Sequence, residues 1–307
     1  MLRHLMGRLG PSTTVGIDVG SAAIKVVELD RAGNRLVLRR AMIAALGTDS
    51  PSAVLKTFFN GSAASTQANI GLASPEVAVR PFAFPPMPRK ELAAAIQLEA
   101  EQAILNGHGP EDVVTDWHLL PSTGKDGFRG VLAVVPRSVL ESRMQLLQQA
   151  SLRPAVVDVE SLALWNAYWA LLGSRESSPK TVLLVNVGAA TTNLVIATGR
   201  DALIVTRDLQ LGARALEAQP GDWIAEVRDS LAYARSHGGL RSLDQALLTG
   251  GGATAALLPT VQSAIPVSVE IWNPLAQLAR ETHQLSIDES GGPLLAVAIG
   301  LALRQAT

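Results

Sequence analysis

The chain has 307 residues and a mass of 32.2 kDa, which at roughly 150 residues per domain predicts about two domains. Apolar residues make up 48% of the sequence and the formal net charge is −1, so the chain can bury a sizeable core but lacks the positive field of a general nucleic-acid binder. The absence of cysteine excludes disulfides, thiolate zinc sites, iron–sulfur clusters and a cysteine nucleophile. The sequence has no uninterrupted apolar run of about 18 residues that would predict a membrane span.

The first segment, Met1–Thr14, has leucines at helical spacing with Arg3 and Arg8 between them, but no apolar core typical of a signal peptide. It is either a short membrane-surface helix or a frayed leader. Gly7 and Gly10 weaken helix propensity and favour the leader.

Strand-like segments then form a pattern typical of a three-stranded meander. These are Val15–Val19, Ile24–Leu29 and Leu36–Ala41, with glycine-containing turns between them. Ser50 and Pro51 are start signals for a helix near Ser52–Phe59.

Residues 71–150 predict the order strand, helix, strand, strand, helix, which should form a sheet with two helices on one face. The segments are Glu76–Phe84, Lys90–Leu105, Val113–Leu120, Gly130–Val135 and Ser138–Ala150. A strand at Ala155–Val159 and a buried helix at Leu162–Leu172 follow.

After the polar linker Ser174–Lys180 the opening meander recurs, which indicates an internal duplication. Its strands are Thr181–Val187, Asn193–Ala197 and Ala202–Leu209. The remaining predicted elements are a helix at Trp223–Ser236, a strand at Ala246–Leu248, a helix opened by Gly250–Gly252, a strand near Val267–Ile271 and a closing helix at Leu294–Leu303.

Three glycine-containing segments are candidates for a phosphate and nucleoside site. They are Gly16-Ile17-Asp18-Val19-Gly20-Ser21, Asn186-Val187-Gly188-Ala189-Ala190-Thr191-Thr192 and Leu248-Thr249-Gly250-Gly251-Gly252-Ala253. Two hairpins that face each other across a cleft can present backbone N–H groups and a hydroxyl to a phosphate, because glycine lets the backbone approach closely. In this order, and with the duplicated meander, the segments resemble those of the actin-like ATPase superfamily.

Within that superfamily the sequence resembles the PilM family of type IV pilus assembly proteins from Thr14 to Arg304. Lys25 and Glu28 complete an opening close to that of the family. The other matching stretches are Arg80–Pro88 with the helix after it, Val157–Leu164 and Trp272–Leu275.

The resemblance implies an α/β, two-lobed actin-like fold (ribonuclease H-like and duplicated), laid out as in the cell-division protein FtsA. The first lobe would comprise 14–70 and 151–180 with a C-terminal helix at 293–304. An inserted α+β subdomain would span 71–150, and 181–292 would form a second lobe whose upper part is mostly missing. Family members are cytoplasmic, bind ATP, and dock on the inner membrane by gripping the cytosolic tail of a membrane partner, PilN. We expect such a tail and other pilus assembly proteins as partners, and no nucleic acid.

The resemblance also implies which residues would hold ATP. They are Asp18, Gly20, Ser21, Lys25, Asn186, Gly188, Thr191, Thr192, Gly250, Gly251 and Gly252. Asp18 either faces Mg²⁺ through water or is a polar turn residue, and Lys25 either meets a phosphate or is an exposed strand residue. Glu160 could orient an attacking water, but we favour its reading as an acid at a helix N-terminus.

Two departures from the family predict that ATP and Mg²⁺ binding is weak or lost. The second hairpin usually begins with Asp, whereas Asn186 contributes no charge to a hard cation. Ala213–Ala246 has room for only one good helix and a loop, so the adenine would lack a wall.

The function predicted is therefore a scaffold that binds a peptide from a membrane partner, with an active ATPase or a sugar-kinase-type phosphotransferase as the alternative. We expect the peptide in a groove between the first lobe and the insertion, at the apolar, proline-stiffened stretch that follows Arg80. The residues expected to contact it are Arg80, Phe82, Phe84, Pro85 and Met87. Arg80 by itself is expected rather to cap the following helix or to pair with Glu91 or Glu99. The sequence leaves open whether the apparatus is a type IV pilus or a type II secretion system.

Overall fold

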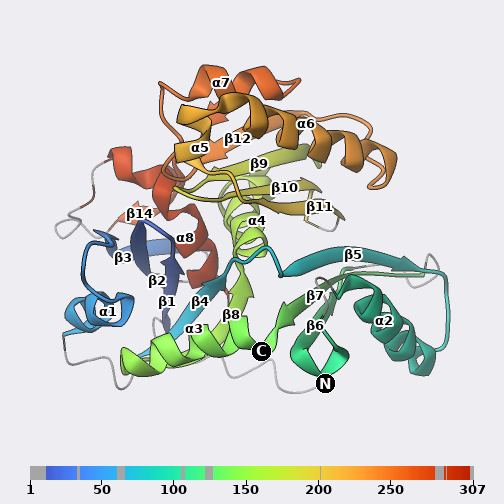
Figure 1. Ribbon diagram of the computed structural model, residues 1–307, viewed down its shortest axis with the longest axis horizontal. Coiled ribbons are helices and arrows are strands. Elements are labelled where there is room, and N and C mark those ends of the chain that lie inside the picture. The colour runs from blue at the N-terminus through green and yellow to red at the C-terminus, as the bar shows by residue number, and fades with distance from the viewer. Residues whose placement is uncertain are drawn as a thin grey trace.

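The computed structural model describes residues 12–32, 35–60, 66–104, 108–121, 127–200, 202–280, 287 and 289–304. Figure 1 shows a lobe at the lower left, a second lobe at the top and an inserted subdomain at the lower right, each built on its own sheet. The leader up to residue 11, the predicted turns at 33–34 and 122–126 and the predicted helix end at 106–107 lie outside the described residues.

The sheet of the first lobe has six strands in the order β14-β3-β2-β1-β4-β8. Their bounds are β1 Ser12–Val19, β2 Ala23–Ala32, β3 Arg35–Ala45, β4 Gln67–Leu72, β8 Arg153–Val159 and β14 Ala279–Arg280. The predicted meander is confirmed, since β1 and β3 both pair antiparallel with β2. Helix α1, Pro51–Phe59, begins as predicted, with the Ser50 side chain accepting a hydrogen bond from the Ala53 N–H.

Strand β4 was not predicted. It pairs in parallel with both β1 and β8, so Gly71 and Leu72 still belong to the first lobe, and the sheet of the insertion begins at Ala78.

The insertion has three strands in the order β5-β7-β6. They are β5 Ala78–Phe84, β6 Val113–Leu119 and β7 Phe128–Pro136, with the 3₁₀ turn Pro110–Asp112 before β6. Helix α2, Arg89–Ala103, covers one face through Leu92, Ile96 and Ala100.

The expectation that a second helix shares this face is wrong. Helix α3, Arg137–Gln149, packs instead against the first lobe, where Leu147 joins Val15 and Ile17 in one core. The reason is its position on the crossover that leads from β7 back to β8, which places its apolar side over the first sheet.

The second lobe has a five-stranded sheet in the order β11-β10-β9-β12-β13. The strands are β9 Thr181–Val187, β10 Thr192–Thr198, β11 Ala202–Leu209, β12 Gln245–Thr249 and β13 Val269–Ile271. Two helices, α5 Ala213–Ala218 and α6 Pro220–Ser236, lie where one helix and a loop were predicted. The glycine triplet does not open a helix, because the next helix, α7, spans Leu258–Ala264.

Two buried helices lie between the sheets of the two lobes (Figure 1). They are α4, Glu160–Leu171, and α8, Ala296–Ala302, which follows a 3₁₀ segment at Glu289–Leu295. They cross at Gly300, where a Cβ atom would collide with the carbonyl oxygen of Ala163. The Asn69 side chain fixes the end of α8 by donating hydrogen bonds to the carbonyl oxygens of Leu301 (2.7 Å) and Arg304 (2.8 Å).

No helix within the described ranges is long and apolar enough to cross a bilayer.

Candidate functional site

The first predicted hairpin, β1–β2, holds a buried ion pair. Asp18 and Lys25 lie opposite each other in the ladder, and the lysine Nζ is 3.0 Å from the Asp18 Oδ2. Burial by itself would lower the pKa of Lys25, but the Asp18 carboxylate offsets this and raises the pKa above its ordinary value. Gly20 closes the turn by donating its N–H to Ala23, and a Cβ on it would lie 2.8 Å from the lysine Nζ. Ser21 is exposed at the tip.

Glu160 begins α4 beside this ion pair and is buried (7% exposed). Its burial, together with the Asp18 carboxylate, raises its pKa to about 8. The positive charges of Lys25 and Arg143 act in the opposite direction, and Asp208 of the second lobe raises the pKa further. Glu160 is thus predominantly protonated near neutral pH and contributes little of the charge that a helix-capping acid would supply.

The second predicted hairpin, β9–β10, is linked to the same region by a chain of side-chain hydrogen bonds. The Asn186 amide donates to Asn193 Oδ1 (2.8 Å), and the Asn193 amide donates to Asp208 Oδ1 (2.9 Å). Burial raises the pKa of Asp208. The two hairpins therefore converge on one polar cluster, which we call the interlobe cluster: Asp18, Lys25, Glu160, Asn186, Asn193 and Asp208.

Other residues of the second hairpin serve its own structure. Gly188 donates its N–H to the carbonyl oxygen of Thr191. Thr192 is fully buried, and its hydroxyl donates to Leu211 (2.6 Å) while accepting from the Trp223 indole (3.0 Å). The hydroxyl of Thr192 is therefore not positioned for a phosphate.

The glycine triplet packs directly on the second hairpin. Gly250 has a φ of 87°, and a Cβ there would lie 2.6 Å from Asn186 Oδ1. Its N–H donates to Pro293, and the N–H of Gly252 donates to Val187. Gly251 has open space around it. Two of the three amide groups expected at the nucleoside are thus used within the protein.

In the part of the chain that the structure describes, no group of three or more acidic or histidine side chains could hold a metal ion. Asp18, the residue expected near Mg²⁺, is already neutralised by Lys25.

The stretch after Arg80 does not form one exposed patch. Phe82 is buried, Phe84 and Met87 pack against the same core under α2, and the two phenyl rings are 5.2 Å apart. Pro85 is exposed at the end of β5. Three of the five residues expected to contact a partner thus build the insertion itself.

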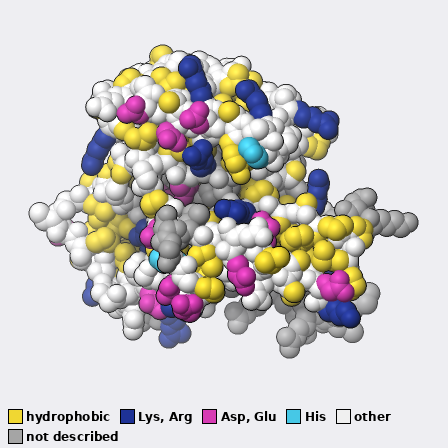
Figure 2. Space-filling view, turned by 45° about the vertical axis from the view of Figure 1, so that its right-hand side comes forward, with side chains coloured by type: hydrophobic (Ala, Val, Ile, Leu, Met, Phe, Trp, Pro, Cys, Tyr) yellow, Lys and Arg dark blue, Asp and Glu magenta, His cyan; other side chains and the backbone are white. Residues whose placement is uncertain are grey.

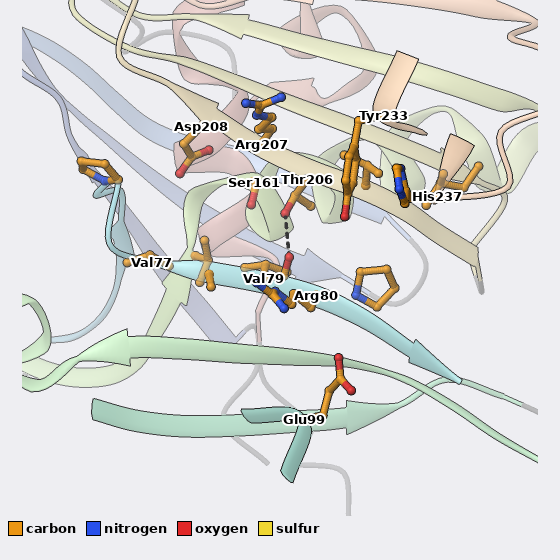
Figure 3. Close-up of a pocket in the computed structure, with 17 residues that line it drawn as sticks. Val77, Val79, Arg80, Glu99, Ser161, Thr206, Arg207, Asp208, Tyr233 and His237 are labelled. Atoms are coloured by element: carbon orange, nitrogen blue, oxygen red, sulfur yellow. Dashed lines mark hydrogen bonds between the residues drawn. The ribbon is translucent and has the colours of Figure 1, made fainter. Parts of the chain in front are cut away.

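Arg80 lines a different feature, a cleft of about 670 Å³ between β5 and the second lobe. Figure 3 shows Arg80 on β5 below Thr206 and Arg207 of β11. Tyr233 of α6 and His237, directly after that helix, lie above it. The stacked rings of Tyr233 and His237 are 4.8 Å apart. In Figure 2 the cleft is a hollow below the second lobe, with basic side chains beside it.

The expected pairing of Arg80 with Glu91 or Glu99 is wrong: among the described residues its side chain makes no ion pair or hydrogen bond.

A groove of about 590 Å³ runs between the first lobe and the insertion, where one was expected, but strands β6, β7 and β8 line it and the stretch after Arg80 does not. Its two sides are edge strands of different sheets, β8 of the first lobe and β6 of the insertion. Strand β6 is exposed from Thr115 to His118, and Trp117 is 42% exposed. We call this feature the β6–β8 groove.

Side chains along β7 point alternately to the two faces of the sheet, and those on one face form the floor of the groove. Leu132 and Val134 point to α2, whereas Val131, Ala133 and Val135 face the groove. Asp158, buried on β8, lies 2.8 Å from Arg304 Nε at one side. Burial raises the pKa of Asp158, which the Arg304 charge opposes.

Comparison with known families identifies the chain. The family model described as type IV pilus assembly protein PilM matches residues 16–220, well over half of the sequence.

This chain belongs to the PilM family.

Among solved structures, the PilM–PilN type IV pilus biogenesis complex has a chain that is 23% identical, with a TM-score of 0.79, over 96% of this chain and 98% of that one. This PilM-family chain therefore has the actin-like fold expected from its motifs. Weaker likenesses are to the cytoplasmic domain of EpsL, an inner-membrane component of the type II secretion system of Vibrio cholerae, and to an archaeal actin homologue. The first has a TM-score of 0.48 and 12% identity, covering 95% of each chain. The second has a TM-score of 0.42 and 11% identity, covering 95% of this chain and 98% of that one.

Proposed function

We propose that this PilM-family chain is a cytoplasmic adaptor of type IV pilus assembly, held at the inner membrane by the cytosolic tail of a PilN-like protein lying extended in the β6–β8 groove. The observation that carries the proposal is the pair of facing edge strands. Each edge offers backbone N–H and C=O groups to an added strand, and the apolar side chains of β7 between them offer pockets for alternate side chains.

Membership of the PilM family supports the part of the proposal that assigns the chain to type IV pilus assembly. The solved PilM–PilN complex supports the part that names a PilN-like protein as its partner. The groove is largely preformed, because β6, β7 and β8 belong to sheets with their own cores. Binding should therefore need little ordering of the protein, and affinity should come from a few buried anchors of the tail.

We expect Ala133→Arg to weaken binding of the tail at least tenfold. Ala133 faces the groove, so a long charged side chain there would occupy the space of the tail while leaving the core under α2 intact. The measurement is fluorescence anisotropy with a labelled peptide of the cytosolic tail of the organism's own PilN.

The matched control is Ala83→Arg. Ala83 is exposed on β5 of the same sheet but lies outside the groove. Equal affinities of the two folded variants for the peptide would place the tail elsewhere.

The second part of the proposal is that Mg²⁺–ATP is bound weakly and is not turned over. The internal bonds of Thr192, Gly250 and Gly252 support this, as does the pairing of Asp18 with Lys25. The alternative, a phosphotransferase, needs a carboxylate base facing an acceptor hydroxyl, whereas Asp18 is paired with Lys25 and Asp208 accepts from Asn193.

By calorimetry we expect a dissociation constant of about 1 mM or weaker for Mg²⁺–ATP, which corresponds to about −4 kcal/mol. Phosphate release by the parent should not exceed that of a Ser21→Ala, Lys25→Ala double variant. Micromolar binding, or turnover that this double variant abolishes, would restore the ATPase as the function.

A further inference from the structure

A second pocket of about 590 Å³ continues the β6–β8 groove toward the far end of α4, and we call it the tryptophan pocket. The two cavities share four lining residues: His118, Val131, Leu162 and Arg304. An extended segment in the groove would therefore run directly into this pocket.

The pocket has an apolar floor and a basic rim. Trp165 and Trp169, one helical turn apart on α4, contribute to the floor. The indole N–H of Trp165 donates to the carbonyl oxygen of Gly199 (3.4 Å), which anchors the turn that carries Arg200. Arg31, at the end of β2, lies on the rim with Arg200.

Two observations point to a ligand that supplies acceptors. Arg31 and Arg200 are exposed, and their side chains make no ion pair or hydrogen bond within the described ranges, whereas Arg304 is paired with Asp158. The amide nitrogen of Asn166, which also lines the pocket, is buried without a hydrogen-bond partner among the described residues. A buried donor without a partner is costly, and an incoming carboxylate or carbonyl oxygen would satisfy it.

We infer that the tryptophan pocket is a specificity subsite for the same tail, taking an apolar side chain on its tryptophan floor and an adjacent acidic side chain against Arg31 and Arg200. The inference rests on the proposed function, because the continuity of the two cavities selects the occupant. The chain's own leader is a poorer candidate, since Arg3 and Arg8 carry the same sign of charge as the rim.

The test uses two labelled peptides: the cytosolic tail of the organism's own PilN, and the same peptide with every Asp and Glu replaced by its amide. We expect the double variant Arg31→Glu, Arg200→Glu to bind the acidic tail at least tenfold more weakly than the parent protein does. Its affinity for the neutralised peptide should stay within twofold of the parent's affinity for that peptide. Arg235→Glu, a reversal of an exposed charge on α6 outside the pocket, is the control and should bind both peptides as the parent does. If the double reversal does not fold, the double variant Arg31→Gln, Arg200→Gln replaces it. Its affinity should fall at least threefold for the acidic tail and should not change for the neutralised peptide.

Unchanged binding of the acidic tail by the double variant, while Ala133→Arg abolishes binding, would overturn the subsite and leave the groove standing. A tail without acidic residues would overturn it too. Failure of the parent to bind the tail at all would overturn both proposals. A double variant that binds the peptide as the parent does, but no longer sediments with phosphatidylglycerol vesicles, would overturn the peptide subsite in favour of a lipid headgroup.

Discussion

Replacing Gly300 with alanine should cost about 3 kcal/mol or more of unfolding free energy, although the same change in an exposed helix usually gains about 1 kcal/mol. Gly300 has an ordinary helical backbone in α8, so alanine meets no conformational strain there. The obstacle is the carbonyl oxygen of Ala163 on α4, which occupies the position of the added methyl group. To make room, α4 and α8 would have to separate, and the core shared by both lobes would loosen.

The measurement is urea denaturation, with the midpoint compared at an unchanged slope. Gly221→Ala is the matched control, because Gly221 lies in the first turn of α6 with no atom near the added methyl. It should leave stability unchanged or raise it by up to about 1 kcal/mol. A Gly300→Ala variant as stable as the parent would show that the two helices do not pack this closely.

Replacing Glu160 with glutamine should make the protein more stable than the parent above pH 8. Glu160 has a pKa of about 8 in the folded protein and an ordinary value of 4.5 when unfolded. Between these values the folded state holds a proton that the unfolded state has lost. The free energy of unfolding should therefore fall as the pH rises through this window, by at most about 1.4 kcal/mol per pH unit from this group.

Glutamine is uncharged at every pH, so the variant should lack this decline, and its advantage over the parent should grow to a few kcal/mol by pH 9. Thermal unfolding from pH 5 to pH 9 would measure it. Glu141→Gln, at an exposed position on α3, controls for the loss of a carboxylate and should follow the parent. Parallel curves for the parent and Glu160→Gln would mean that Glu160 is ionised in the folded protein.

Local sequence was sufficient for most of the fold. Strands β9 and β11 match their predicted bounds because each is an apolar run ended by glycine or polar turn residues. Strand β4 escaped prediction since its six residues include Asn69 and Gly71, and only its pairing with β1 and β8 makes it a strand. The packing of α3 was not predicted for a related reason. The chain topology, and not the apolar pattern of α3 itself, determines which sheet this helix covers.

The candidate sites were likewise predictable only where their residues are close together in the sequence. The hairpin motifs were visible because turn glycines and their neighbours are adjacent in sequence. The hydrogen-bond partners of the hairpin and glycine-triplet residues could not be predicted, because they come from distant segments. The Trp223 indole donates to the Thr192 hydroxyl, and the Gly250 N–H donates to the carbonyl oxygen of Pro293. A groove between the first lobe and the insertion was expected, but its edges are set by the order of strands in two sheets, so no single stretch of sequence could assign it to β6 and β8.

The bond between Asn69 and Leu301 joins residues 232 positions apart. During synthesis, strands β1, β2 and β4 therefore emerge long before α8, which later covers one face of their sheet. Non-local closure of this kind is slow, and the uncovered apolar face is open to aggregation in the interval. A chain that stops before residue 296 would lack α8, so one apolar face of the first sheet would stay uncovered.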